Sequence, residues 1–230
     1  MAATSAIDDD ETGVALANRH FLYRYLWRAF AAKPDETLLE VARGQHALEA
    51  CGLVSDTAAR IQQAIAQLAR ADVSAGGVAS LEAEYTRVLI GPASLPAPPW
   101  ESVFATGENL IFQESTLAVR AAYRAAGYVA AGYPREADDH LATELDFMAT
   151  LAEEACTAYE AGDAERAHAS LQVQRQFLSE HLNTWAKPFS DRLERAAGKD
   201  AGGLYVHFAQ LCAEVCAADE ERVSGLMVDA

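Results

Sequence analysis

The residues best suited to chemistry lie between positions 134 and 148, where one histidine stands among carboxylates. His140 has Glu136 one helical turn before it and Glu144 one turn after it, so a helix would place all three on one flank. Imidazole and carboxylate groups can ligate metals. Di-iron bundles, however, place glutamate and histidine three residues apart and repeat the pair on a second helix, and we find no second copy of such a motif here. We therefore keep metal binding or catalysis in a helical bundle, with His140, Glu136 and Glu144 as the ligands, as the alternative interpretation rather than the main one.

Two other interpretations of the same segment depend on its charge. Asp138 and Asp139 stand at the start of an expected helix, where carboxylates are stabilised by exposed N–H groups, so capping and solvated surface explain them most simply. Residues 136–160 also contain eight acidic residues and no lysine or arginine. Arginine pairs two-pronged with carboxylates such as those of Glu136, Asp139 and Glu144. An acidic helix edge that binds a cationic peptide is the functional interpretation.

A second conspicuous segment, residues 91–107, contains four of the seven prolines. Proline lacks a backbone donor and restrains the residue before it, so the sequence predicts a stiff loop here. Pro99, Trp100 and Glu101 form a rigid apolar ridge beside an acid. This ridge either fills a gap in the core or forms one wall of a groove for an apolar segment flanked by positive charge.

Helical periodicity covers most of the remaining chain, and no strand-like alternation persists. The sequence predicts an all-α, single-domain bundle of about nine or ten helices, with the proline-rich loop in its middle. Residues 1–12 are expected to be a flexible acidic N-terminus, residues 13–230 the helical domain, and residues 127–134 a hinge. Expected helices span residues 14–32, 34–51, 80–90, 113–126, 137–161, 163 to a kink at Pro188, and 204–216, with one capped at Ser55 or Asp56 and another through Phe189 and Leu193.

Composition excludes several classes of function. Acidic residues outnumber basic ones 34 to 18, a net charge of -16 that repels nucleic acid and anionic lipid. No apolar run is long enough to span a bilayer, and the N-terminus does not resemble a secretory signal. The four cysteines form no CxxC pair, which suits a reducing cytoplasm. Motifs for nucleotide binding, nucleophilic catalysis or zinc binding are absent from the sequence, so we expect no enzymatic activity.

The two conspicuous segments together resemble the TorD/DmsD family of redox-enzyme maturation chaperones. The resemblance runs from about Val14 to Asp219 and is most specific in the His140 segment. The matching motifs are residues 85–92 (YTRVLIGP) and 97–104 (APPWESVF), similar to the family's tyrosine helix and proline loop; residues 136–148 (EADDHLATELDFM), similar to its E-x-x-D-H-x-x-x-E-L-x-F-M signature; and, more weakly, residues 181–185 (HLNTW) with Phe189.

The resemblance implies a cytoplasmic chaperone for molybdenum-cofactor oxidoreductases of the dimethyl-sulfoxide-reductase type. Such proteins bind the twin-arginine signal peptide or the apo catalytic subunit and delay export until the cofactor is inserted. The resemblance also implies weak guanine-nucleotide binding in some members, no resident cofactor, and either a monomer or a helix-swapped dimer. Family motif positions around the peptide-binding surface are occupied here by Pro99, Trp100, Glu101, Asp139 and His140, with Glu136 and Glu144 in the same signature.

Overall fold

The computed structural model describes residues 5–75, 77–91, 94–108, 110–198 and 202–227. Eleven α-helices and two π-helical segments make up the regular structure of these residues, and the only bridge between extended residues in them joins Trp100 to His140. The predicted all-α bundle is therefore confirmed. None of the described helices has the length and apolarity needed to cross a membrane.

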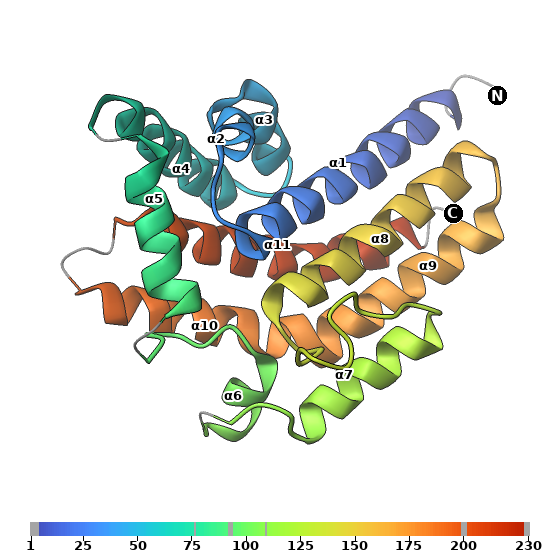
Figure 1. The fold of residues 1–230 in the computed structure, drawn as a ribbon. Helices are drawn as coiled ribbons and strands as arrows, with labels where there is room; N and C mark the ends of the chain where they lie inside the picture. The colour runs from blue at the N-terminus through green and yellow to red at the C-terminus, as the bar shows by residue number, and fades with distance from the viewer. Residues whose placement is uncertain (1–4, 76, 92–93, 109, 199–201, 228–230) are drawn as a thin grey trace.

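A layer of three long helices forms one side of the bundle. Helix α1 (Ser5–Ala31) lies along α8 (Leu141–Glu160), and α8 packs against α9 (Ala164–Phe177) (Figure 1). Helix α11 (Leu204–Leu226) passes through the centre of the molecule and contacts α10 (Asn183–Ala197) along much of its length. The α8 face that these neighbours cover is rich in alanine, which allows the helices to approach closely.

The remaining helices cover the two ends of this layer. Helices α2 (Glu36–Arg43) and α3 (Gln45–Gly52) pack on α4 (Asp56–Ala75), which in turn contacts α11. Helix α5 (Val78–Tyr85) continues into the π-helical segment η1 (Thr86–Ile90). At the opposite end, α6 (Glu101–Thr106) and α7 (Glu114–Ala125) form the lower edge of the molecule in Figure 1. The proline-rich segment and α6 thus connect the two ends.

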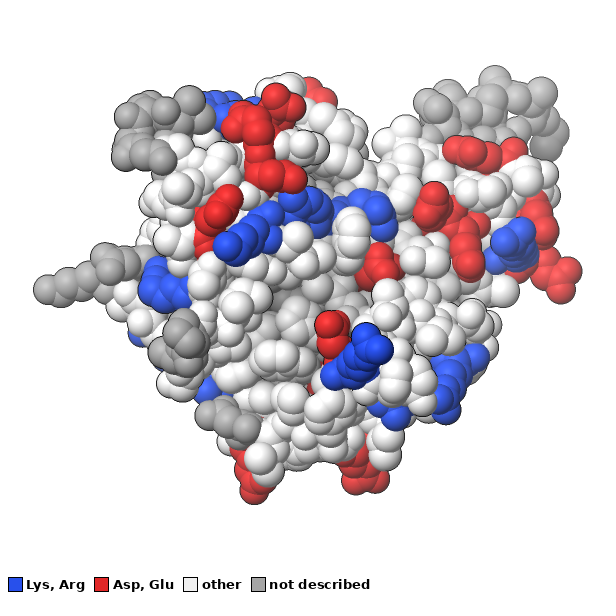
Figure 2. All heavy atoms as spheres, in the orientation of Figure 1, with Lys and Arg blue, Asp and Glu red and all other residues white. Residues whose placement is uncertain are grey.

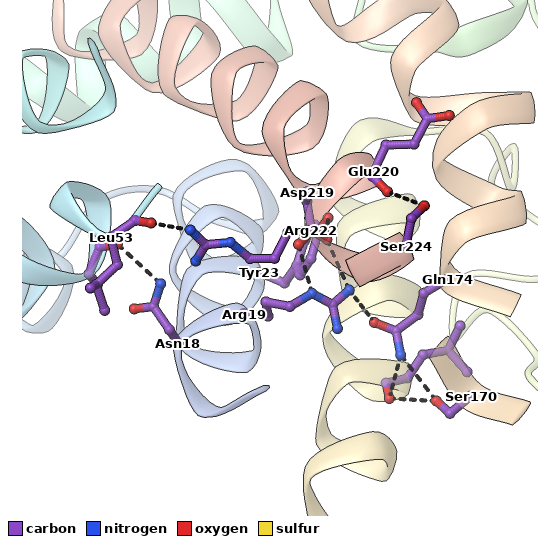
Figure 3. A network of polar contacts seen from close by, with 12 residues as sticks. Asn18, Arg19, Tyr23, Leu53, Ser170, Gln174, Asp219, Glu220, Arg222 and Ser224 are labelled. Carbon is purple, nitrogen blue, oxygen red and sulfur yellow. Dashed lines mark hydrogen bonds and ion pairs between the residues drawn. The ribbon is translucent and has the colours of Figure 1, made fainter. Parts of the chain in front are cut away.

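A buried ion pair ties the first helix to the last. Arg19 Nε donates to Asp219 Oδ1 at 2.7 Å, and the hydroxyl of Tyr23 donates to Asp219 Oδ2 at 2.7 Å (Figure 3). The guanidinium also donates to Gln174 Oε1 at 2.6 Å, which extends the contacts to α9. We call Arg19, Tyr23, Gln174 and Asp219 the Arg19 network. It crosslinks three helices that are far apart in the sequence.

Several predicted helix boundaries are wrong. Gly44 divides the helix expected over residues 34–51 into α2 and α3, because its extended backbone ends the first of them. The last helix, expected to end near Cys216, continues to Leu226, because Asp219, Val223 and Leu226 are buried. Tertiary burial outweighs the polar local sequence there.

Pro188 neither breaks nor ends a helix. It lies inside α10, with the buried side chains of Trp185 and Phe189 on either side of it. The irregularity instead occurs earlier, at the π-helical turn η2 (Leu178–Leu182) between α9 and α10. Packing of the apolar stripe therefore holds the helix together across the missing proline hydrogen bond.

The N-terminal and hinge predictions concern segments at the edges of these elements. Residues 1–4 of the expected flexible N-terminus lie outside the described residues, and α1 begins at Ser5 rather than at Val14. Residues 127–134 form turns between α7 and α8. A hinge at this point stays a prediction.

Candidate functional site

The two conspicuous segments of the sequence lie side by side in the structure. Leu141 N donates to Pro99 O at 2.9 Å, and Glu101 N donates to Asp139 O at 3.0 Å. These bonds flank the antiparallel bridge between Trp100 and His140, whose rings meet edge to face at 5.2 Å between centroids. The backbone alone therefore fixes the relative position of the two segments.

Asp139 performs a different capping role from the one expected. Its carboxylate is fully buried, and its Oδ2 accepts a hydrogen bond from Ser102 N at 2.9 Å, so it caps α6 rather than α8. The predicted helix start at 137 is wrong for this reason: the chain is still extended at residue 140 and α8 begins at Leu141. The loop containing Trp100 also becomes helical earlier than expected, at Glu101.

His140 is the N-cap of α8. Its Nδ1 accepts a hydrogen bond from Ala142 N at 3.1 Å, which requires a neutral imidazole with Nδ1 unprotonated. Burial lowers the pKa of His140 to about 4, although the neighbouring Asp139 carboxylate acts in the opposite direction. The histidine is therefore neutral at physiological pH, and one of its ring nitrogens is occupied as a hydrogen-bond acceptor for its own helix.

Asp138 connects the same segment to α7. Its carboxylate pairs with Arg120, with Nε at 2.8 Å, and its backbone oxygen accepts from the hydroxyl of Tyr123 at 3.1 Å. The expectation that Asp138 or Asp139 caps α8 is therefore wrong for both residues. Each instead joins the extended segment before α8 to a neighbouring helix.

Two further carboxylates of the motifs point into the core. Glu101 contacts His181 Nδ1 at 3.0 Å, and Glu144 Oε2 accepts from Trp185 Nε1 at 3.1 Å. Burial raises the pKa of Glu144 well above its usual range, and the nearby Glu101 adds to the effect. Glu101, Asp139 and Glu144 are 5%, 0% and 0% exposed, and we call them the carboxylate cluster.

The carboxylate cluster is incompletely hydrogen-bonded. Among described side chains, Asp139 Oδ1 and Glu144 Oε1 are buried without a hydrogen-bond partner. A buried polar atom without a partner is costly. A protonated Glu144 reduces this cost, because a neutral carboxyl group loses less solvation than a carboxylate.

The predicted site residues divide into an inner and an outer set. Pro99 is buried together with the carboxylate cluster. Trp100 and His140 are half-buried, and Glu136 is exposed in the turn before them. Only these last three offer side chains to a partner. The inner residues hold the extended segments in place.

The alternative metal site is not favoured. Glu144 turns inward to Trp185, Glu136 is exposed, and His140 Nδ1 binds the backbone of its own helix. Within the described ranges, no group of three histidine, cysteine, aspartate or glutamate side chains is arranged to hold a metal ion.

The acidic edge expected along α8 is partly neutralised. Asp146 accepts from the hydroxyl of Tyr128 at 2.7 Å and lies 3.5 Å from Arg24 of α1. Figure 2 shows a row of basic side chains across the middle of this face, over the C-terminal half of α1. Much of the surface over α6 and α7 is uncharged in the same view.

Sequence reasoning did not assign roles to Ser102, Arg120, His181 and Trp185, although each contacts a motif carboxylate. A signal existed for the last two, which lie one helical turn apart in the weaker motif at residues 181–185. The partner of His181 is 80 positions away in the chain, and the partner of Trp185 is 41 positions away. No local pattern predicts such pairs.

Comparisons with known proteins agree with this architecture. A family described as nitrate reductase delta subunit matches residues 54–191. The Tat proofreading chaperone DmsD of Salmonella typhimurium is 35% identical over 112 residues, which cover 49% of this chain and 48% of the relative. The chaperone protein TorD of Vibrio cholerae serotype O1 is 30% identical over 147 residues, 64% of each chain. The DmsD match thus spans about half the length of that relative.

A solved structure shows the same fold. The redox enzyme maturation protein from Archaeoglobus fulgidus superposes with a TM-score of 0.50 at 21% identity, covering 85% of this chain and 91% of that chain. The curated relatives are chaperones rather than catalysts. Because the family match covers more than half of the sequence, this chain belongs to the nitrate reductase delta subunit family, which includes the TorD and DmsD maturation chaperones.

Proposed function

We propose that this protein is a cytoplasmic chaperone for a molybdenum-cofactor oxidoreductase of the dimethyl-sulfoxide-reductase type. It binds the twin-arginine signal peptide of the apo catalytic subunit and delays export until the cofactor is in place. The observation that carries the proposal is the backbone pairing of residues 99–101 with residues 139–141, which gathers the two motif segments into one surface. The name of the DmsD relative, a Tat proofreading chaperone, supports the same role.

The outer set of residues makes the direct contacts in this proposal. Glu136 is an exposed carboxylate and pairs with an arginine of the peptide, for which a forked guanidinium is well suited. Trp100 and His140 provide an aromatic surface for the adjoining apolar residues. Tryptophan is among the side chains that contribute most to binding energy at interfaces. Pro99, Glu101, Asp139 and Glu144 act as positioning residues beneath this surface.

The net charge of the chain supports a cationic partner. At -16, the protein attracts a basic peptide and repels acidic ones. Part of the affinity then comes from attraction between exposed charges, which salt screens. We therefore expect the dissociation constant to rise with added salt, and to rise less steeply for a Glu136→Gln variant.

A peptide titration tests the proposed function. Labelled twin-arginine signal peptides from oxidoreductases of the same source are titrated with wild-type protein, together with matched peptides in which lysines replace the two arginines. We expect selective binding of the arginine peptide. Trp100→Ala should weaken it about tenfold, which corresponds to about 1.4 kcal/mol, whereas Glu136→Gln should weaken it about threefold.

Two control variants isolate these contacts. Trp27→Ala removes a half-buried tryptophan from α1, and Glu153→Gln removes an exposed carboxylate from α8. Both should bind the arginine peptide as the wild type does. Equal affinity of wild type for the arginine and lysine peptides, or an equal loss in the controls, would refute the proposed contacts.

A further inference from the structure

A small pocket lies between the C-terminal half of α7 and the turns that follow this helix, and it encloses about 110 Å³. We call it the Tyr133 pocket, and its walls are formed by Arg120, Tyr123, Arg124, residues 128–130, Tyr133 and Asp138. Sites for cofactors and other small molecules usually enclose about 300–1,000 Å³. A cavity of about 150 Å³ holds one benzene ring. The Tyr133 pocket therefore has room for one side chain, but not for a nucleotide or a cofactor.

The turns after α7 fix the apolar walls of the pocket. Gly127 has a φ of 74°, which lets the chain reverse so that Tyr128 N donates to Tyr123 O at 2.8 Å. The rings of Tyr128 and Tyr123 then meet edge to face at 5.1 Å between centroids. The hydroxyl of Tyr128 donates to Asp146 Oδ2 at 2.7 Å, so this wall is also fastened to α8. The fold itself therefore holds the apolar walls in place.

Tyr133 forms the opposite wall and lies beside two arginines. The guanidinium carbons of Arg120 and Arg124 are 5.0 Å and 5.7 Å from the centre of its ring, within the range of cation–π attraction. Arg124 Nη2 also donates to the hydroxyl oxygen of Tyr133 at 3.4 Å. Because two cations already lie at this wall, they repel a cationic ligand and attract an anionic one.

The two arginines differ in their counter-charge. Arg120 Nη2 lies 2.7 Å from Asp138 Oδ2, and Asp138 is only 2% exposed. Arg124 is exposed and has no carboxylate partner among the described residues. It is not needed as a helix cap, because the last carbonyl oxygens of α7 accept from the backbone N–H groups of residues 126–128. The walls of the pocket therefore keep one unpaired positive charge, although the whole chain is acidic.

The combination of a cation with apolar walls selects the ligand. A guanidinium forms two parallel hydrogen bonds with a carboxylate, which favours carboxylates over neutral acceptors. The tyrosine rings and the side chain of Ala130 offer apolar contacts to a short hydrocarbon chain. A glutamate side chain has both parts, because methylene groups separate its carboxylate from the backbone. An acidic side chain of a partner protein therefore fits the pocket in size, charge and polarity.

The Tyr133 pocket borders the proposed peptide-binding surface. Asp138 forms part of its wall and lies two positions before His140 in the chain, and two residues span at most about 7 Å. The hydroxyl of Tyr123 donates to Asp138 O at 3.1 Å, which fixes the pocket relative to that segment. A polypeptide segment bound at Trp100 and His140 can therefore place a nearby side chain in the pocket.

We propose that the Tyr133 pocket binds a glutamate side chain of the oxidoreductase subunit, the client, in a segment close to the arginines that bind at Glu136. This inference rests on the proposed function and adds a contact of the opposite charge to it. The client then needs an acid and a base at a fixed spacing, because Arg124 and Glu136 each favour one sign of charge. A segment that carries the arginines alone lacks one of the two contacts, so the pocket adds specificity to the recognition of the client.

Nuclear magnetic resonance tests the pocket without any signal peptide. Wild-type protein is titrated with N-acetylglutamate methylamide and, separately, with the matched glutamine compound, while backbone amide shifts are recorded. We expect the glutamate compound to shift the amides of residues 124–133 and to bind about threefold more tightly than the glutamine compound, as for an exposed ion pair. Arg124→Gln should abolish this difference, whereas Arg166→Gln, at an exposed arginine on α9, should keep it.

A peptide titration then tests the client contact. A labelled twin-arginine signal peptide carries one glutamate, which is moved through the positions on either side of the arginines, and each peptide is compared with its glutamine counterpart. We expect at least one position at which glutamate strengthens binding to wild type about threefold. Arg124→Gln should remove this gain, and Arg166→Gln should retain it. Circular dichroism verifies that both variants are folded.

The outcomes separate failure of the pocket from failure of the proposed function. If the glutamate and glutamine compounds bind wild type equally, the pocket assignment is overturned and the proposed function is unaffected. If the glutamate compound binds selectively but no peptide position gains affinity, the assignment to the client is overturned. If wild type binds no signal peptide at all, the proposed function is overturned, although the pocket keeps its preference for an acidic side chain. An equal loss in Arg166→Gln would assign the effect to net charge and also overturn the pocket.

Discussion

Two buried groups of polar side chains in this molecule differ in their charge: one pairs a cation with an anion, and the other is an excess of carboxyl groups. The Arg19 network pairs a guanidinium with the carboxylate of Asp219 through two short hydrogen bonds, and Tyr23 and Gln174 complete the set (Figure 3). The carboxylate cluster contains three acidic side chains, and the partners seen for them are His181, Trp185 and a backbone amide. No lysine or arginine pairs with the cluster among the described residues.

The difference indicates different roles. A buried charge that is paired with its counter-charge crosslinks helices and tolerates burial, although Arg19 Nη1, like one oxygen each of Asp139 and Glu144, has no hydrogen-bond partner among the described residues. Burying ionised carboxylates without counter-charges costs free energy. Such a group persists only where the packing around it keeps the carboxyl groups in place. The Arg19 network therefore acts as scaffold, whereas the carboxylate cluster lies directly beneath the proposed binding surface and supports the segments that form it.

The largest expected effect comes from breaking the Arg19 network. Asp219→Ala leaves the Arg19 guanidinium buried without its counter-charge, so we expect the free energy of unfolding to fall by about 3–5 kcal/mol. Urea unfolding measures this loss. Asp191→Ala, in an exposed ion pair with Lys187 on α10, should cost less than about 1 kcal/mol. Equal losses in the two variants would remove the distinction between scaffold and surface pairs.

The second prediction concerns the pH dependence of the carboxylate cluster. Burial raises the pKa of Glu144. The folded state therefore keeps a proton that the unfolded chain releases near the ordinary pKa of glutamate, about 4.3. Stability attributable to this group is present below that pH and is lost as pH rises toward the folded pKa.

Glu144→Gln tests this sign. The amide oxygen can still accept from Trp185, and no charge forms at high pH. Urea unfolding between about pH 5 and pH 8 should show the variant gaining about 1 kcal/mol relative to wild type. Glu153→Gln on the same helix should follow the wild-type curve. A loss of relative stability in Glu144→Gln as pH rises would show that Glu144 is ionised and stabilised instead.

The smallest effect at neutral pH is expected at His140, on the outer side of the cluster. Burial lowers its pKa from 6.5 to about 4, so the unfolded chain takes up a proton first as the pH falls. Stability from this group is present above pH 6.5 and is lost between pH 6.5 and about 4.

His140→Asn removes the titration and keeps an N-cap acceptor, so its stability at neutral pH should change by less than about 1 kcal/mol. Thermal unfolding between pH 6.5 and 4 should then give a flatter curve than wild type. His168→Asn, on α9, serves as the control. Parallel curves for wild type and His140→Asn would mean that the folded state protonates as easily as the unfolded chain.

The sequence predicted the all-α class and both motif segments, because periodicity, proline content and charge are local properties. It did not predict which motif carboxylates are buried. The partner of Glu101 is 80 positions away and the partner of Arg19 is 200 positions away. Asp139 illustrates the limit: its position before α8 suggested a cap for that helix, but chain pairing carries its carboxylate to α6.

The π-helical turn η2 has a geometric consequence for the cluster. Helices α9 and α10 follow one another without a break in helical structure, but α9 packs mainly on α8 and α10 mainly on α11. A π-helical turn is equivalent to one extra residue in an α-helix, which rotates all later side chains by about 100°. If the same residues formed a regular α-helix through positions 178–182, Trp185 would turn away from Glu144. The rotation of α10 about its own axis thus determines which aromatic side chain contacts Glu144.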